Sequence, residues 1–379
     1  MKKLLIDINS VIPYYATGRM SGIGRTTQEL VETLSIMEDI PFEISLYSQN
    51  MKGISGKNMN TSFSSHHIYF PHRRKWNKVL SRFPVREWAY NYDLMHIPHN
   101  FEYVYNPHKC IVTLHDAFFM KIEEKKFGHA QMRKEVPPFI RKCKHIITCS
   151  EYSKKDIVET MQISPDKIDV IYWGIRHDQF YPTSDTQESF YFVQKLFGIT
   201  KPYFLSVSCN AERKRSHVLI QAYMELSKQQ EPKHDLVLVW SEPPSEILRK
   251  VEQSNVSKNI HFLSGATNEA LRNLYQAATA SFNPSSYEGF GLPVLEAMAC
   301  GTPAVTCRNS SLPEVGGNAA LYLDEPVLSS LVKMMLCFEN NSLPLMDIRK
   351  AGLTQAAKFT WEQTAQKTLA VYIKNLIHI

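Results

Sequence analysis

The chain of 379 residues is 44% hydrophobic and 21% charged, which excludes a disordered or fibrous protein and indicates about two globular domains. Its formal net charge of +6 comes entirely from residues 1–180, which hold 25 Lys and Arg against 19 Asp and Glu, leaving 18 against 18 in residues 181–379. No run of about 18 apolar residues is present to span a bilayer, and the N-terminal sequence MKKLLIDINS becomes polar too early for a signal peptide. The seven cysteines show no CxxC spacing, so we expect free thiols in the cytoplasm rather than disulfides or a zinc site.

Apolar strands alternate with helices in the first half of the chain, as is typical of doubly wound α/β domains. A glycine-bearing segment, SGIGR at 21–25, follows the first strand and is expected to be a loop. Apolar residues from Leu30 to Met37 then fall at helical spacing and predict a helix. The strands of this half are expected at 3–8, 42–47, 94–97, 110–114, 145–149 and 169–172.

Residues 66–86 form a segment that is rich in basic and aromatic side chains and has no acidic residue. Its aromatic residues Tyr69, Phe70, Trp76 and Phe83 are interleaved with Arg73, Arg74, Lys75, Lys78, Arg82 and Arg86. Such a pattern marks an anionic membrane surface or a nucleic acid. A solvated face whose aromatic side chains pack inward fits the pattern equally well. Of the two ligands we expect the membrane, as a peripheral contact at its inner face, and no nucleic acid.

A second series of strands and helices follows the polar stretch at 177–189, which is the expected linker. The chain ends in an amphipathic pattern at 361–377 that predicts a helix. We therefore expect domains at 1–180 and 181–360, with a C-terminal helical segment at 361–379. The strands of the second half are expected at 203–207, 236–240, 260–263, 280–283, 304–307 and 321–323.

The densest set of signals lies at 285–301, which reads SSYEGFGLPVLEAMACG. A glycine turn follows the strand at 280–283, and Pro293 stands at the start of a helix, where its missing N–H costs nothing. A helix N-terminus behind such a turn offers free N–H groups and a positive dipole end to a phosphate. Glu288 before the turn and Glu296 inside the helix flank this predicted phosphate site.

These two glutamates, with seven residues between them, and the turn that they enclose resemble the signature of the family 4 retaining glycosyltransferases of the GT-B fold. The resemblance implies that Glu296 holds the ribose hydroxyls of a nucleotide sugar and that Glu288 lies against the donor sugar. The alternative is an ordinary exposed helix residue at 296 and glycines that serve only a turn. The turn amides that the resemblance directs at the sugar and diphosphate are those of Gly289, Phe290, Gly291 and Leu292.

The run SCNAERKRSHVLIQAY at 208–223 is similar to the phosphate-binding segment of the family. It supplies Arg213 and Lys214 as cations for the leaving diphosphate, an electrostatic contribution that matters in such catalysis. The chain departs from the family at Ser208 and Cys209, where many members carry glycine and arginine. The alternative for Arg213 and Lys214 is a solvated helix start.

Three further segments resemble parts of the family's site. His115, after the strand at 110–114, matches a histidine that contacts the transferred sugar, although a histidine after a strand is more often a structural hydrogen bonder. Gly22 and Gly24 match a loop where the backbone approaches donor and acceptor closely. In LSGATNEAL at 263–271, the turn at Gly265 and the helix start at Thr267 match the nucleobase side.

The resemblance implies an α/β protein of the GT-B type, with two Rossmann-like doubly wound domains that face each other across a cleft and a C-terminal helix that crosses back onto the first domain. It implies a metal-independent, retaining hexosyltransferase that needs no cofactor and acts in polysaccharide or glycoconjugate biosynthesis. The donor is then a GDP- or UDP-linked sugar, with mannose favoured by the GIGR and SLPEV patterns, and the acceptor is a glycan or a lipid-linked glycan. Three alternatives stay open: a sugar-nucleotide epimerase or a phosphorylase of the same fold, and a noncatalytic nucleotide-sugar-binding component of a glycan assembly complex.

Overall fold

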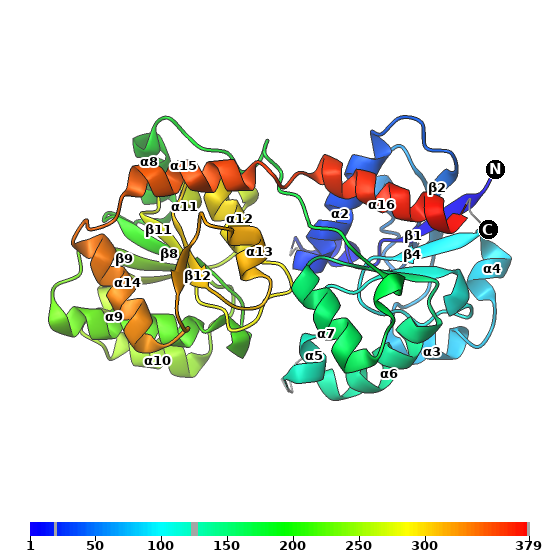
Figure 1. Cartoon of the computed structure of the whole chain (residues 1–379), viewed down its shortest axis with the longest axis horizontal. Helices are drawn as coiled ribbons and strands as arrows, with labels where there is room; N and C mark the ends of the chain where they lie inside the picture. The colour runs from blue at the N-terminus through cyan, green and yellow to red at the C-terminus, as the bar shows by residue number, and fades with distance from the viewer. Residues whose placement is uncertain (19–20, 123–127, 377–379) are drawn as a thin grey trace. The chain divides into compact units, whose positions relative to one another are not determined.

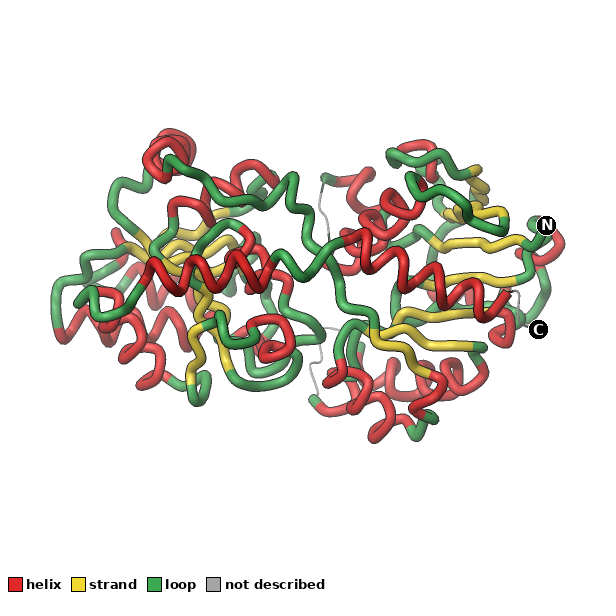
Figure 2. Tube along the Cα trace, turned by 45° about the horizontal axis from the view of Figure 1, so that its top comes forward, coloured by secondary structure: helices red, strands yellow, loops and turns green. Residues whose placement is uncertain are grey.

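The computed structural model describes residues 1–18, 21–122 and 128–376. The chain divides into two compact units, the first formed by Met1–Gly174 with the segment from Trp361 and the second by Ile175–Thr360. The first unit thus ends at Gly174 rather than at residue 180. In each unit, helices cover both faces of a parallel β-sheet (Figures 1 and 2).

The sheet of the first unit has seven strands in the order β3-β2-β1-β4-β5-β6-β7, and all of its pairings are parallel. The order reverses at β1, whose neighbours are β2 and β4. Ligands of such sheets bind outside the carboxyl ends of the strands at this switch point. The strands are β1 (Lys3–Asp7), β2 (Glu43–Gln49), β3 (Ser64–Ile68), β4 (Leu94–Ile97), β5 (Cys110–Thr113), β6 (His145–Thr148) and β7 (Ile168–Val170).

The sheet of the second unit has six strands in the order β10-β9-β8-β11-β12-β13, again all parallel. Here the order reverses at β8, which pairs with both β9 and β11. The loops that follow β8 and β11 therefore meet at one edge of the sheet. The strands are β8 (Tyr203–Val207), β9 (Asp235–Val239), β10 (Ile260–Leu263), β11 (Ala280–Asn283), β12 (Ala304–Cys307) and β13 (Leu321–Leu323).

The helices of the first unit are α1 (Ile12–Thr17), α2 (Gly22–Ser35), α3 (Arg74–Leu80), α4 (Val85–Ala89), α5 (Phe118–Lys121), α6 (His129–Lys142), α7 (Glu151–Met161) and α16 (Trp361–Leu376). Those of the second unit are α8 (Thr186–Phe197), α9 (Ser216–Gln229), α10 (Ser245–Glu252), α11 (Asn268–Ala277), α12 (Leu292–Ala299), α13 (Leu312–Gly316), α14 (Leu328–Glu339) and α15 (Leu345–Ala356). Short 3-10 turns occur at Gly56–Asn58, Pro107–Lys109, Pro165–Lys167, Glu212–Lys214 and Ser257–Asn259.

The C-terminal helix α16 belongs to the first unit, where it packs beside α2 (Figure 1). A buried polar contact fixes it to the sheet, because the Tyr372 hydroxyl lies 2.7 Å from Nδ1 of His96 on β4. Burial lowers the pKa of His96 to about 3, so this imidazole is neutral. Ile377, the last residue of the predicted helix, lies outside the described residues.

Two local expectations are wrong. The segment 21–25 is not a loop, because Ser21 caps α2 by accepting a hydrogen bond from the Gly24 amide, and Gly22 and Gly24 lie in the first helical turn. β3 was not predicted, because its sequence SSHHI has one aliphatic residue and lies at the sheet edge, where less apolar surface is buried. The apolar runs that pair in the sheet interiors begin and end within two residues of the expected bounds.

Candidate functional site

An ion-paired group lies where the loops after β8 and β11 meet, in the second unit. Lys214 Nζ is 2.6 Å from Oε1 of Glu288, and Arg213 Nη1 is 3.2 Å from Oε2. The two cations project from a short 3-10 turn, and their side chains are only 12% and 21% exposed. The alternative of a solvated helix start is therefore wrong, because α9 begins only at Ser216 and both cations face a buried carboxylate.

The carboxylate of Glu288 is held in its charged form. Burial alone would raise its pKa, but the charges of Lys214 and Arg213, with hydrogen bonds from Lys214 and Ser285, lower the pKa to about 2. The Ser285 hydroxyl donates to Oε1 over 2.7 Å. At neutral pH this group holds one negative and two positive charges, and its net positive charge suits an anionic ligand.

The turn from Glu288 to Leu292 is fixed by the segment that precedes α13. The Glu288 amide donates to Ser310 Oγ at 3.0 Å, and the Ser311 hydroxyl contacts the carbonyl oxygens of Glu288 and Phe290 at 2.9 and 2.8 Å. Gly291 precedes α12 with φ of 113°, a conformation that side chains disfavour, and an added Cβ would lie 3.0 Å from Leu312 Cδ2. The helix begins at Leu292, so Pro293 is its second residue rather than its first.

Glu296 is not the exposed helix residue of the alternative interpretation, because it is only 3% exposed. It lies on α12, and the Tyr275 hydroxyl on α11 donates to its Oε2 over 2.9 Å. A buried carboxylate with an oriented oxygen is a suitable acceptor for a pair of hydroxyl groups.

The predicted nucleobase segment forms a turn and a helix cap. Gly265 has φ of 67°, and an added Cβ would meet no atom within 4 Å. Thr267 is the N-cap of α11 and accepts a hydrogen bond from the Ala270 amide over 3.2 Å. Both residues follow β10, at the same sheet edge as the loops after β8 and β11.

In the first unit, His115 follows β5 and is held by the loop after β4. Its amide donates to Asn100 Oδ1 at 2.9 Å, and its Nε2 lies 3.0 Å from the Pro98 carbonyl oxygen. A carbonyl only accepts, so Nε2 carries the proton of the neutral ring and Nδ1 is the acceptor. Burial lowers the pKa of His115 to about 4, although the contact with Pro98 opposes the shift.

Most of the basic and aromatic segment at 66–86 lies on the protein surface. Tyr69, Trp76 and Phe83 are 71%, 52% and 54% exposed, which excludes the interpretation that these aromatic side chains pack inward. Arg86 is an exception among the basic residues: its side chain is 12% exposed, donates to the Tyr103 carbonyl and lies over the Tyr47 ring. The exposed basic residues are Arg73, Arg74, Lys75, Lys78 and Arg82.

Sequence reasoning missed several residues of these sites. Ser285 and Tyr275 were missed because a hydroxyl that orients a carboxylate leaves no spacing signal of its own. A separate group of ionisable side chains at the edge of the first sheet, which includes Asp7 at the end of β1 and Glu102 after β4, was also missed, because only the sheet order brings these residues together. Ser150, by contrast, is a residue that the sequence suggests as either part of a cleft loop or a helix cap, and the structure shows it as the N-cap of α7, accepting from the Ser153 amide over 3.0 Å.

The fold and the site together define the class of protein, a GT-B glycosyltransferase. Two Rossmann-like units are present, and one of them carries a cation pair, two buried carboxylates and a helix N-terminus at its switch point. The family model described as glycosyl transferases group 1 matches residues 188–354, and the model of glycosyltransferase family 4 matches residues 20–179. The chain therefore belongs to the family 4 glycosyltransferases.

The chain is also similar to individual proteins along its whole length. O-antigen chain mannosyltransferase B of Escherichia coli is 26% identical over 93% of this chain and 96% of its own length. The fold matches sucrose-phosphate synthase from Thermosynechococcus elongatus at a TM-score of 0.77 and 17% identity, over 99% of both chains. It matches Anabaena HepE in complex with UDP-glucose at a TM-score of 0.76 and 16% identity, over 99% of this chain and 100% of that one. Among the described residues, no helix is long and apolar enough to cross a membrane.

Proposed function

We propose that this glycosyltransferase is a retaining, metal-independent hexosyltransferase that uses a nucleoside-diphosphate sugar and a glycan or lipid-linked glycan acceptor. The observation that carries the proposal is the pairing of Lys214 and Arg213 with the charged Glu288 beside the turn that leads into α12. A mannosyl donor is the first candidate, because the Escherichia coli relative along the whole chain is a mannosyltransferase. GDP and UDP remain the two candidate nucleotides.

In this proposal the diphosphate takes the place of Glu288 as the partner of Lys214 and Arg213. Leaving-group charge is then met by two side-chain cations and by the N–H groups at the start of α12. The charge is neutralised without a divalent ion between the protein and the diphosphate. Glu288 is released toward the sugar, where a charged carboxylate accepts hydrogen bonds from hydroxyl groups.

Glu296 is the proposed ribose ligand. The Tyr275 hydroxyl donates to Oε2 and orients the carboxylate, which is proposed to accept hydrogen bonds from the two ribose hydroxyls. Turn amides between Gly289 and Leu292 are proposed to face the sugar and the diphosphate. Gly265 and Thr267 are proposed to lie on the nucleobase side, where backbone atoms make the contacts.

In this proposal the anomeric configuration is retained, because the acceptor attacks the sugar from the same face that the diphosphate leaves. The bond from the anomeric carbon to the phosphate oxygen breaks, the acceptor oxygen bonds to the same carbon, and the acceptor proton passes to the departing phosphate. No enzyme nucleophile is required. His115, neutral and with Nδ1 as acceptor, is proposed to bind a hydroxyl of the transferred sugar, and Gly22 and Gly24 are proposed to let the backbone approach the substrates.

The exposed basic and aromatic residues at 69–83 support a peripheral contact with an anionic membrane. Each basic residue near such a surface contributes about 1 kcal/mol, and exposed aromatic rings add interfacial burial. Lys78 is 59% exposed and Arg74 is 40% exposed, although both also contact Glu135 on α6. A lipid-linked acceptor would be presented at the same surface.

Nucleotide release from a panel of GDP- and UDP-linked hexoses, with and without EDTA, tests the proposed reaction. Turnover of one donor class in EDTA supports it. A protein that binds nucleotide sugars but releases no nucleotide with any glycan acceptor would be the noncatalytic component instead. Bound pyridoxal phosphate, visible by its absorption, would identify a phosphorylase.

A further inference from the structure

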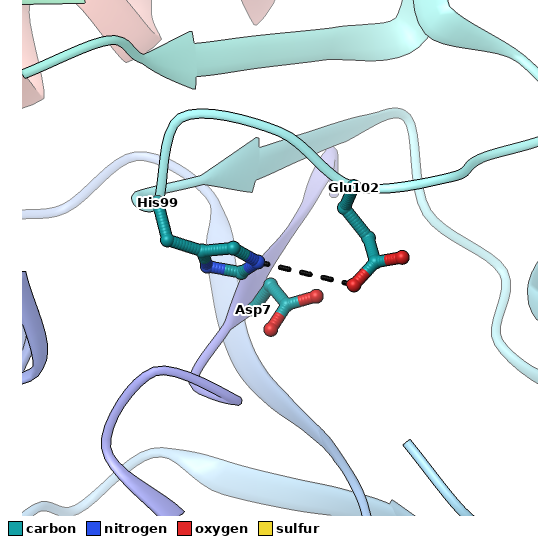
Figure 3. A group of neighbouring side chains, drawn as sticks. All are labelled: Asp7, His99 and Glu102. Carbon is teal, nitrogen blue, oxygen red and sulfur yellow. Dashed lines mark ion pairs between the residues drawn. The ribbon is translucent and has the colours of Figure 1, made fainter. Parts of the chain in front are cut away.

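A cluster of ionisable side chains lies at the carboxyl edge of the first sheet, apart from the residues assigned above. Asp7 ends β1, and His99 and Glu102 lie in the loop that follows the neighbouring strand β4. The three side chains come together, with both carboxylates on the same side of the His99 ring and Asp7 beside the line that joins His99 to Glu102 (Figure 3). One ligand atom from each residue lies within 4.8 Å of those of the other two.

The cluster contains buried polar atoms that no hydrogen bond satisfies. Oδ1 of Asp7 accepts from the amide and the side chain of Asn9, both at 2.8 Å, but Oδ2 has no partner. Asp7 is 0% exposed, so water does not reach this oxygen. Both ring nitrogens of His99 are also buried and without a hydrogen-bond partner. Buried polar groups without partners are rare, so these atoms need an explanation, and an ion-binding role is one that their chemistry allows.

The two carboxylate oxygens of Glu102 contact different neighbours. Oε1 accepts from the Tyr103 amide at 2.7 Å and from Asn77 at 3.2 Å, and Arg86 lies 3.8 Å away. Oε2 is 2.7 Å from His72 Nε2 and 3.9 Å from His99 Nε2. The oxygen that faces His99 therefore keeps an acceptor position that a further ligand can use.

We propose that Asp7 Oδ2, His99 and Glu102 Oε2 bind one divalent cation of the zinc class. One imidazole and two carboxylates are a donor set that zinc accepts, at about 2.0 to 2.2 Å from each ligand atom. Ligand atoms around one such ion lie about 3.4 Å apart, so side-chain rotations that shorten the separations, now within 4.8 Å, by up to about 1.4 Å complete the site. The two carboxylates favour a cation, whereas Arg86, and His72 when it is protonated, oppose it through their charge.

The space at this cluster is small, which favours a metal ion over a substrate hydroxyl as its ligand. The unpaired atoms of Asp7 and His99 each have almost no surface accessible to water, so a sugar ring cannot contact them directly. An ion that sits between its ligands needs no such surface. The competing occupant is a proton on His99 that bridges the two carboxylates.

A cation here would hold the loop that positions His115. The Pro98 carbonyl and the Asn100 side chain, on either side of His99, are the partners of His115. Asn100 has φ of 38°, an uncommon conformation that its neighbours must maintain. The site is thus a positioning device for the first unit, and its cation is separate from the diphosphate charge assigned to Lys214 and Arg213.

Calorimetric titration of the full chain with Zn²⁺, after treatment with EDTA and its removal, tests the proposal. We expect one site per chain, and affinity lower by about tenfold or more in both Asp7→Asn and His99→Gln. His108→Gln, at an exposed histidine of the same unit, is the matched control and should bind as the unaltered protein does. Equal Zn²⁺ affinity in Asp7→Asn and the unaltered chain would overturn the site.

Binding of Co²⁺ provides a second test, which uses the unaltered protein and so does not depend on a variant folding correctly. The absorption spectrum of the Co²⁺ complex should show nitrogen and oxygen ligation without thiolate charge-transfer bands. Thiolate bands would assign the metal to a cysteine, such as the exposed Cys209, and would overturn the proposal. Absence of metal binding together with a lower melting temperature of His99→Gln would identify the bridging proton as the occupant and likewise overturn it.

Discussion

The ammonium group of Lys214 lies 2.6 Å from Oε1 of Glu288, so the cation assigned to the diphosphate and the carboxylate assigned to the sugar are paired with each other. Arg213 contacts the other carboxylate oxygen at 3.2 Å. The pairs hold all three side chains at the turn before α12, and a diphosphate would compete with Glu288 for both cations. In the proposed function, donor binding would therefore replace the ion pairs to Glu288 with ion pairs to the diphosphate, in a site whose charges are already in position.

Removal of the Lys214 charge should lower turnover strongly. We expect Lys214→Ala to reduce kcat/KM by about a hundredfold or more, because one preorganised charge on the leaving group is lost. Lys228→Ala, at an exposed lysine on α9, is the matched control and should leave kcat/KM unchanged.

Turnover should also persist in EDTA, since side-chain cations are proposed to neutralise the diphosphate charge. Loss of turnover in EDTA that Mn²⁺ or Mg²⁺ restores would contradict the metal-independent reaction. The cluster of Asp7, His99 and Glu102 is a separate source of chelator sensitivity, and Asp7→Asn separates the two. If EDTA lowers turnover of the unaltered chain but not of Asp7→Asn, the metal acts at the cluster. If EDTA lowers turnover of both proteins, the metal acts at the donor site.

Glu296→Gln should weaken nucleotide binding. Charge-assisted hydrogen bonds to the ribose are worth about 1.5 to 3 kcal/mol each, and the amide makes only neutral ones. Calorimetry with the nucleoside diphosphate measures the loss, and Glu246→Gln on the exposed face of α10 is the control. Glu288→Gln should instead change kcat more than nucleotide affinity. Unchanged affinity in Glu296→Gln would rule out the ribose assignment.

Much of this site could be predicted because its residues are close in sequence. Glu288, Gly291 and Glu296 lie on one turn and helix, and Arg213 and Lys214 follow one strand, so local patterns reveal them. The burial of Arg86 could not be predicted, because it depends on Tyr47 and Glu102 from other strands and loops. The meeting of Asp7 with His99 likewise depends on β1 pairing with β4 across about ninety residues of sequence.

The low pKa of His115 predicts how stability varies with pH. Its pKa of about 4 lies below the usual value near 6.5, so between these values the unfolded chain binds a proton that the folded chain does not. The free energy of unfolding should therefore decrease as pH falls from about 6.5 to 4. Chemical denaturation across this range should show a weaker decrease in His115→Asn, and an identical decrease would contradict the assignment. The kcat/KM profile should show no inflection from His115 near pH 6.5.

The exposed basic residues of α3 and its N-terminus should bind anionic vesicles at low salt. Co-sedimentation should fall as salt rises, because surface charges are screened over about 8 Å at physiological ionic strength. Replacing Arg73, Arg74, Lys75 and Lys78 with serine should abolish it. Serine at the exposed Lys228, Arg249, Lys250 and Lys350 of the second unit is the control. Equal sedimentation of both variants, or none by the unaltered chain, would remove the membrane contact and favour a soluble glycan acceptor.

The most direct measurement of the proposed reaction is donor turnover with the anomeric configuration of the product read by nuclear magnetic resonance. The protein would be incubated in EDTA with GDP- and UDP-linked hexoses and a glycan acceptor. We predict release of the nucleoside diphosphate from one donor class, with mannose first, and a product bond of the same anomeric configuration as the donor. Inversion of that configuration, or release of nucleotide only when a divalent cation is added in both the unaltered chain and Asp7→Asn, would contradict the reaction proposed for Glu288, Lys214 and Arg213.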